Sequence, residues 1–495
     1  MYDTHQLRAA FARSLSAMYG REVPAYMTLV DTSTAVNADY VAAHPDTAER
    51  LGRIDRVTAE RHGAIRVGTA RELARVAQIF AALGMEPVGF YDLRGDAATS
   101  LPIVSTAFRP TTPEALAINP FRVFTSVLVT DDRRYFDRAL QAELDSFLAG
   151  RELFGDDVVA LAARAEAEGG LPDADAAAFL AAATACFELT TEPVERAWYT
   201  RLAAISGVAA DIGGVPRTHI NHLTPRVLDI DDLYARMSAQ GIAMIDEIQG
   251  PPAWEGPDVL LRQTSFKALA ERRRFREADG SVVDGTLSVR FGEVEQRGIA
   301  LTPAGRDLYD RMIVEVDERA AGLSPEGRHD VKLAVWRAHL PASEQGLADA
   351  GLAWFEYAPA AVLPEGVPPT RLDALVAGGW LVRTPIVYED FLPRSAAGIF
   401  ASNLDSAGSR DTTREGSHRD EAWLAEAMGR RVHDPMALYA AQRQASLEAA
   451  ASAWGVAIAA DAEHSGHLWP DSGPRVKPHG DETTDDPRHT SEATR

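Results

Sequence analysis

The stretch Glu60-Arg61-His62-Gly63-Ala64-Ile65-Arg66-Val67-Gly68 has the pattern of a short β-strand, with small and β-branched residues between a polar start and a final glycine. Side chains on a strand alternate between its two faces, so His62, Ala64 and Arg66 point to the same side. A possible metal ligand and a guanidinium that can pair with a carboxylate thus share one surface. This pattern favours a metal site for an acidic substrate, but a surface histidine beside a solvated arginine fits these nine residues equally well.

The order of elements that begins with this strand is predicted twice. After the first strand, Thr69 and Glu72 have the spacing of a capping box, and apolar residues then recur with helical periodicity up to Gly84. A second strand-like run, 218–224, also precedes a helix, which opens at 229–232. Each half therefore begins with a histidine-bearing strand, and the sequence predicts a repeated βαβββ unit. The strand-like segments that follow the two helices are 85–93, 102–108 and 121–129 in the first half, and a run from 242, 259–266, 274–278 and 286–295 in the second.

Composition separates the rest of the chain into three further parts. An alanine-rich helical pattern between the two units predicts an inserted helical subdomain, in which no chemistry is evident. The C-terminal region mixes helices with short strands, and the final residues are polar and rich in Pro, Gly, Asp and Thr, which predicts disorder. One catalytic unit is expected over residues 1–462, with βαβββ modules at about 50–130 and 211–300, the helical insertion at 131–210, a mixed region at 301–462 and a disordered tail at 463–495.

The charge of the chain limits its partners. The 495 residues carry a formal net charge of −22, from 72 acidic and 50 basic residues. Nucleic acids and anionic membranes require basic patches, so neither is expected as a partner. Cys186 is the only cysteine, which excludes a disulfide within the chain, and no apolar run is long enough to span a bilayer. We therefore expect a cytoplasmic protein, in which a small anionic substrate would need a local basic pocket.

Several residues have the types needed for a metal centre. Two histidines and one carboxylate with open positions form the site of non-haem Fe(II) oxygenases, and His62 is the first candidate. His219 and His222 are three residues apart, so on a strand only one of them can point into the site. Glu293 and Glu295 share a face, so alternation does not choose between them. Each residue alone is compatible with a structural or solvated role, but as a set on a repeated unit they predict a metal centre.

Motifs dispersed along the chain resemble known families. The paired βαβββ units resemble the vicinal-oxygen-chelate superfamily. The run His222-Leu-Thr-Pro-Arg-Val-Leu-Asp229-Ile230 resembles the second-histidine segment of hydroxyphenylpyruvate dioxygenases and hydroxymandelate synthases, and Glu293-Val-Glu-Gln296-Arg297 resembles their metal-glutamate segment. The chain resembles the 2-oxoadipate dioxygenase/decarboxylase family over about residues 1–460, through Arg61-His-Gly-Ala-Ile-Arg66, Asn221-His-Leu-Thr-Pro-Arg226, the Glu293 segment and Asp390-Phe-Leu-Pro-x-Ser-Ala-Ala-Gly-Ile-Phe400.

This resemblance implies a fold, a reaction and a set of site residues. The implied fold is α+β, with two vicinal-oxygen-chelate-like βαβββ units forming a metal-centred half-barrel, a large helical insertion and extra C-terminal α/β elements. The implied enzyme uses Fe(2+) in lysine breakdown and converts 2-oxoadipate and O₂ to (R)-2-hydroxyglutarate and CO₂. The implied ligands are His62, His222 and Glu293, so that Glu295 is not one. The residues implied to bind the substrate are His62, Arg66, Arg394 and Ser395, of which Arg66 would hold a carboxylate.

Arg394 departs from the family pattern, which has a small apolar residue between Pro393 and Ser395. The backbone at this position is expected to line the substrate pocket. If only the backbone is used, the change is harmless. If the side chain turns inward, the preferred length of the 2-oxo acid changes.

Two other functions remain open at this point. One is a metal-dependent lyase or isomerase of the same superfamily, which would use Zn²⁺ or Ni²⁺ without O₂ and for which Glu295 is a further possible ligand. The other is a non-catalytic, metal-stabilised binding protein. A structural metal is expected to have a closed ligand shell, often with several cysteines, and this chain has one.

Overall fold

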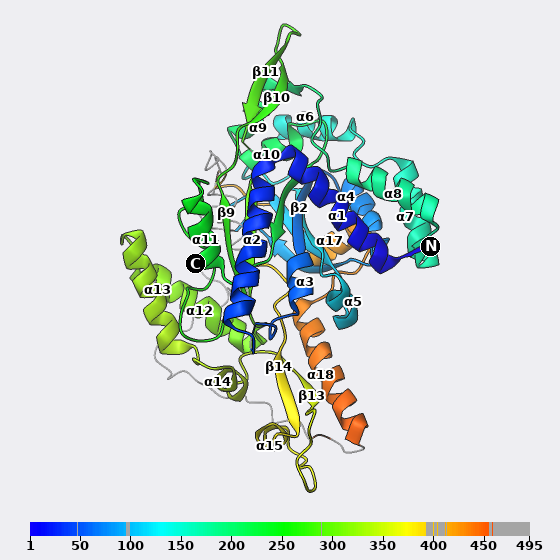
Figure 1. The fold of residues 1–495 in the computed structure, drawn as a ribbon. Helices are drawn as coiled ribbons and strands as arrows, with labels where there is room; N and C mark the ends of the chain where they lie inside the picture. Colours follow the sequence, from blue (N-terminus) through cyan, green and yellow to red (C-terminus); the bar gives the residue numbers. More distant parts are fainter. Residues whose placement is uncertain are drawn as a thin grey trace, which may run out of the picture.

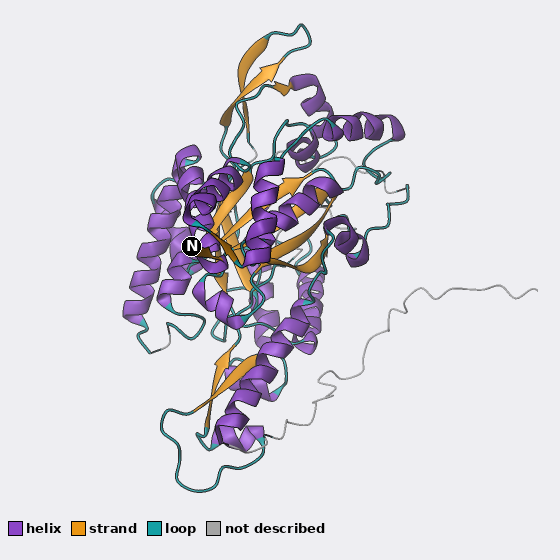
Figure 2. Ribbon diagram, turned by 90° about the vertical axis from the view of Figure 1, so that its right-hand side faces the viewer, coloured by secondary structure: helices purple, strands orange, loops and turns teal. Residues whose placement is uncertain are grey.

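The structure, a computed structural model, describes residues 1–46, 48–95, 100–288, 290–392, 399, 403, 411, 413–454 and 458. Its fold is mixed α/β, with β-sheets near the centre and helices around them (Figures 1 and 2). The tail predicted to be disordered, 463–495, lies outside the described residues, and so do Arg394 and Ser395. Among the described helices, none has both the length and the apolar composition needed to cross a lipid bilayer.

The stretch around His62 forms the expected strand, β2 (Arg61–Val67), inside a five-stranded sheet. The helix after it, α4 (Ala70–Ala81), begins at the predicted capping box: the Thr69 hydroxyl accepts from the Glu72 N–H, and the Glu72 carboxylate accepts from the Thr69 N–H. The first unit thus has the expected strand–helix–strand–strand–strand order, with α5 (Pro113–Ile118) inserted before its last strand. The order across the sheet is β3 (Glu86–Asp92), β4 (Ile103–Arg109), β5 (Arg122–Leu128), β2 and β8 (Ile220–Pro225).

The second unit begins at β8, which pairs antiparallel with β2. It continues through α11 (Ile230–Ala239), whose first turn is capped by the Asp229 carboxylate. An isolated bridge between Arg226 and Glu295 places β12 (Gly292–Arg297) beside β8, and β12 pairs antiparallel with β9 (Leu261–Phe266). The prediction of a continuous strand from residue 242 is wrong. Two isolated bridges, at Met244 and Gln249, join this segment to β9.

The strand predicted at 286–295 is two strands that belong to different sheets. β10 (Glu271–Arg276) and β11 (Val282–Leu287) form a hairpin that pairs with β7 (Val194–Glu195) and projects from the molecule (Figure 1). The chain then returns to the central strands as β12. Arg290 fixes this return, since it is fully buried and its Nε donates to the Glu271 carboxylate at 2.9 Å. A glycine follows at 292, where a Cβ would lie 1.9 Å from the Phe266 ring.

Alternation along β2 divides its side chains between two apolar cores. Ile65 and Val67 lie in one core with α1 (Thr4–Glu22) and α4, whereas Ala64 lies in the other with Phe124. His62 and Arg66 are on the same side as Ala64, and they are only 1% and 3% exposed. Burial excludes a solvated surface pair, because an imidazole and a guanidinium inside the protein need specific partners.

The predicted insertion is helical and packs against the N-terminal part of the chain. The two-residue strands β1 (Tyr2–Asp3) and β6 (Gly170–Leu171) pair antiparallel, and α1 contacts α8. The last helix of the insertion, α10, leads directly into β8. The bounds are α6 (Arg138–Ala149), α7 (Asp156–Glu168), α8 (Asp173–Ala185), α9 (Arg196–Ala203) and α10 (Gly207–Gly213), and the N-terminal helices are α2 (Pro24–Ala43) and α3 (Ile54–Ala59).

The C-terminal region mixes helices and strands, as predicted. The pair β13–β14 lies at the end of the molecule opposite the β10–β11 hairpin (Figure 1). After β14 the chain returns to the centre, where the Tyr388 N–H donates to the Gly298 carbonyl at 2.9 Å. The elements are α12 (Pro303–Arg319), α13 (Pro325–His339), α14 (Glu344–Asp349), β13 (Phe355–Pro359), α15 (Leu372–Ala377), β14 (Leu381–Pro385), α17 (Glu421–Met428) and α18 (Pro435–Trp454).

Candidate metal centre

His62, His222 and Glu293 come together where β2, β8 and β12 lie side by side. One ligand atom from each residue lies within 4.8 Å of the other two. The Nε2 atoms of the two histidines are each 3.3 Å from a different oxygen of the Glu293 carboxylate. All three side chains are buried. Two imidazole nitrogens and one carboxylate fit a divalent transition metal and match the donor set of non-haem Fe(II) oxygenases.

His219 lies outside this cluster, but simple alternation is not the reason. The pairing of β2 with β8 has an irregularity: Ala64 faces His222, whereas the next residue, Ile65, faces Ile220. The extra residue on β8 disturbs the alternation on which the prediction relied. The His219 ring instead pairs with Asp211: its Nε2 lies 3.3 Å from the Asp211 carboxylate, not in the cluster.

The two glutamates of β12 have different surroundings. Glu293 lies in the cluster and accepts a hydrogen bond from the Gln263 amide. Glu295 accepts from Arg297 twice, with Nε and Nη2 each at 2.8 Å. Although burial alone would raise the pKa of Glu295, the charges of Arg297 and His62 hold it well below its usual range. Glu295 is thus a buried, paired carboxylate next to the centre, and it is absent from the three-residue cluster.

The two imidazoles differ in electrostatic surroundings. Burial lowers the pKa of His222 to about 4 and outweighs the adjacent Glu293 carboxylate, which acts to raise it. The charges of His62 and Arg66 lower that pKa further. Burial also acts to lower the pKa of His62, but the adjacent Glu295 and Glu293 carboxylates outweigh it and raise that pKa. A metal binds the neutral form of imidazole, so His222 is ready for a metal throughout the neutral pH range.

Arg66 is held at one end of the centre by helix α10. Its Nη1 donates to the Asp211 carboxylate, which lies on α10 and is also an acceptor for the Asn221 amide at 2.9 Å. The Thr218 hydroxyl donates to the Arg66 carbonyl at 2.6 Å. Burial would raise the pKa of Asp211, but His219 and Arg66 lower it. Helix α10, which runs across the predicted end of the insertion at residue 210, therefore contributes a carboxylate to the site.

Aromatic rings pack against both imidazoles of the cluster. The Phe391 ring lies edge-on to the His62 ring, with the ring centres 5.0 Å apart, and it also packs against Phe124. The Phe291 ring is 5.1 Å from that of His222. These rings exclude water from the imidazoles, which strengthens every electrostatic interaction at the centre.

Residues 11–403 match the sequence model of the 2-oxoadipate dioxygenase/decarboxylase family. The chain belongs to this family. A 2-oxoadipate dioxygenase/decarboxylase of Mycobacterium tuberculosis is 54% identical over 442 residues, which cover 89% of this chain and 97% of that protein. One from Pseudomonas putida is 42% identical over 460 residues, with 90% and 96% covered. The crystal structure of the Pseudomonas putida hydroxyglutarate synthase in complex with 2-oxoadipate is similar, with a TM-score of 0.79 at 38% identity, and covers 92% of this chain and 99% of that one.

Membership of the 2-oxoadipate dioxygenase/decarboxylase family confirms the resemblance found in the dispersed motifs. The structure brings together His62, His222 and Glu293 from three of those motifs and places Arg66 beside Asp211. Arg394 and Ser395, from the fourth motif, lie outside the described residues, so their expected contact with the substrate stays a prediction.

The sequence analysis did not identify the buried polar residues that surround the metal ligands and Arg66. Glu60 and Glu389 directly precede two of the family motifs. Their place beside these motifs is the only feature of the sequence that could have indicated a role at the site. Arg122, Asp211 and Gln263 lie outside those motifs and gave no signal. Glu60 is fully buried, and its carboxylate lies 2.7 Å from Arg122 and 3.0 Å from Arg226.

The Glu60 cluster predicts a stability that depends on pH. Burial would raise the pKa of Glu60, but Arg122 and Arg226 outweigh it and lower the pKa from 4.5 to about 2. The lowered pKa stabilises the folded state above pH 4.5, and this contribution is lost as the pH falls toward about 2. In denaturant unfolding of the apoprotein, we expect Glu60→Gln to cost on the order of 3 kcal/mol at pH 7 and progressively less below pH 4.5. An equal cost at pH 7 and pH 3 would contradict this origin.

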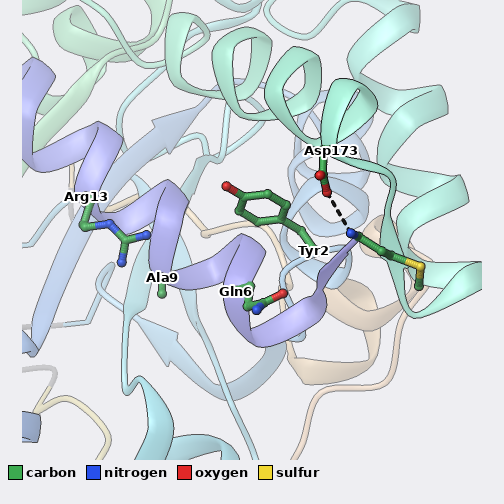
Figure 3. A pocket seen from close by; sticks show the side chains of 6 residues that line it. Tyr2, Gln6, Ala9, Arg13 and Asp173 are labelled. Carbon is green, nitrogen blue, oxygen red and sulfur yellow. Dashed lines mark ion pairs between the residues drawn. The ribbon is translucent and has the colours of Figure 1, made fainter.

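A surface hollow near the N-terminus contains none of the predicted site residues. The amino group of Met1 lies 2.7 Å from the Asp173 carboxylate there, and both groups are largely exposed. No buried polar group of this hollow points to a ligand. Its lining residues, between α1 and the start of α8, are Met1, Tyr2, Gln6, Ala9, Arg13 and Asp173 (Figure 3).

Proposed function

We propose that this chain is an Fe(2+)-dependent dioxygenase/decarboxylase that converts 2-oxoadipate and O₂ to (R)-2-hydroxyglutarate and CO₂. The observation that carries the proposal is the buried His62, His222 and Glu293 cluster, with an arginine on the same face of β2. Its relatives at 54% and 42% identity carry the name of this activity. The place of the reaction in lysine breakdown stays a prediction.

Each residue of the site has a separate role in the proposed reaction. His62, His222 and Glu293 hold the metal, and Gln263 fixes the Glu293 carboxylate. An iron ion held there would supply a centre that binds the 2-oxo acid and reduces O₂. Arg66, oriented by Asp211, pairs with a substrate carboxylate, since a guanidinium fork matches the geometry of a carboxylate. The surrounding rings and the burial of all these groups keep bulk water from the reacting atoms.

The strand arrangement supports a vicinal-oxygen-chelate half-barrel over residues 50–130 and 211–300. In each half the first strand lies beside the last: β2 pairs in parallel with β5, and β8 has a parallel bridge to β12. The two first strands, β2 and β8, pair with each other, which brings both histidines to the junction of the halves. We infer that the halves, the insertion and the C-terminal region act as one catalytic unit within residues 1–462.

Isotope labelling tests the reaction. Each 2-oxoadipate consumed should take up one O₂, release one CO₂ and yield one 2-hydroxyglutarate, which balances all atoms without another reductant. With ¹⁸O₂, one label should appear in the new carboxylate and one in the new hydroxyl, unless an oxygen exchanges with water first. Mass spectrometry of the product measures both labels.

The same assay separates the alternatives. A lyase or isomerase would turn over without O₂ and incorporate no label, and a binding protein would consume no 2-oxo acid. Turnover under anaerobic conditions at the aerobic rate would overturn the proposal. Because Arg394 departs from the family pattern, 2-oxoglutarate and longer 2-oxo diacids belong in the same series, and a different preferred length would change the substrate but not the reaction.

A further inference from the structure

The His62 imidazole lies between two carboxylates of one strand. Its Nε2 is 3.3 Å from Glu293 and its Nδ1 is 2.9 Å from Glu295. The two glutamates are two residues apart on β12 and therefore project from the same side of the strand. We propose that Glu295 is a positioning residue, whose carboxylate lies against Nδ1 of His62 and so keeps the Nε2 lone pair turned toward the metal.

Glu295 is itself fixed on its other sides. The residue is fully buried, and Arg297 donates to both of its oxygens. Arg122 adds a third contact, with Nη1 3.3 Å from Oε1. Arg297 in turn donates to the main-chain carbonyls of Tyr388 and Asp390, at 2.8 and 3.0 Å. A carboxylate held in this way cannot follow the imidazole when it rotates, so its charge at Nδ1 fixes the orientation of the ring.

The other histidine of the cluster lacks such support. Within the described part of the chain, His222 has an ion-pair contact through Nε2 alone, with Glu293. The two imidazoles are therefore inequivalent. His62 has a carboxylate behind it, which makes its nitrogen a more basic ligand, whereas His222 is held by the packing of its ring against Phe291.

Metal affinity gives a direct measure of this support, because partners of this kind typically contribute about 10- to 100-fold to metal binding. The inference rests on the metal site of the proposed function. The apoprotein would be titrated with Co²⁺ alone under anaerobic conditions, by calorimetry and by visible absorption. Glu295→Ala is expected to bind one Co²⁺ about 10- to 100-fold more weakly, with shifted absorption bands. Glu295→Gln should bind Co²⁺ at least about threefold more weakly than the parent, but less weakly than Glu295→Ala, because its amide oxygen can still face Nδ1 without the negative charge.

Glu72→Gln is the matched control. Glu72 is also a buried carboxylate paired with an arginine, but its partner is Arg151 and it caps α4 away from His62, so folded Glu72→Gln should bind Co²⁺ within about twofold of the parent. An equal loss in Glu72→Gln and Glu295→Ala would overturn the positioning role, as would a parental dissociation constant in Glu295→Ala. If Glu295→Ala does not fold, Glu295→Gln decides, and parental affinity there overturns the proposal.

A third variant separates this inference from the metal site itself. His62→Ala should weaken Co²⁺ binding more than either Glu295 variant. Parental affinity in His62→Ala would show that the assigned metal site is wrong. A large loss in His62→Ala together with parental affinity in both Glu295 variants would overturn only the role of Glu295.

Discussion

Alanine at His62, His222 or Glu293 is expected to abolish O₂ uptake and to remove most of the bound metal. Each substitution deletes one of three protein donors whose atoms lie within 4.8 Å of one another. Two remaining donors bind a divalent ion far more weakly, and the 2-oxo acid and O₂ then have no common centre. Metal content after gel filtration and O₂ consumption with 2-oxoadipate measure the two effects separately.

His219→Ala is the matched control for the histidines. His219 is buried and close in sequence to His222, but its Nε2 faces Asp211 rather than the cluster. The variant should keep the metal. Full activity in His222→Ala, or loss of metal in His219→Ala with retention in His222→Ala, would show that the wrong histidine was assigned.

Arg66→Lys is expected to lose about 2 kcal/mol of transition-state stabilisation, or roughly 30-fold in kcat/KM. A lysine ammonium carries the same charge but cannot form the two parallel hydrogen bonds of a guanidinium with a carboxylate. The ammonium also cannot contact the Asp211 carboxylate and a substrate carboxylate in the way that two different nitrogens of one guanidinium can. Steady-state kinetics with 2-oxoadipate measure the loss, and metal content should be unchanged.

Arg61→Lys is the control for this substitution. Arg61 lies on the same strand, but its Nη1 donates to the carbonyls of Thr58 and Glu60 rather than to a site residue. Its replacement should leave kcat/KM within about twofold of the parent, as is usual for a substitution away from a site. Parental kcat/KM in Arg66→Lys would mean that Arg66 does not hold the substrate carboxylate.

Prediction from the sequence succeeded where the structure depends on neighbouring residues. The capping box of Thr69 and Glu72 started α4 at the expected place, because a cap involves only residues within one helical turn. Prediction failed where contacts between residues far apart in the chain set the boundaries of an element. The run at 286–295 reads as one strand, but the buried ion pairs of Arg290 divide it between the β10–β11 hairpin and the central β12.

Sequence alone determined that His62, Ala64 and Arg66 share a face, that the strand–helix–strand order occurs twice, and that the chain resembles one enzyme family. These conclusions depend on strand periodicity and on motifs read directly from the residues. Periodicity predicts the face of the strand on which a side chain lies, but not which strand pairs with it or in what register. The tertiary structure therefore decided that Glu293 faces the histidine Nε2 atoms while Glu295 contacts Nδ1 of His62, and that Asp211 reaches Arg66 from α10. Each of these contacts depends on pairing or packing between segments far apart in the chain.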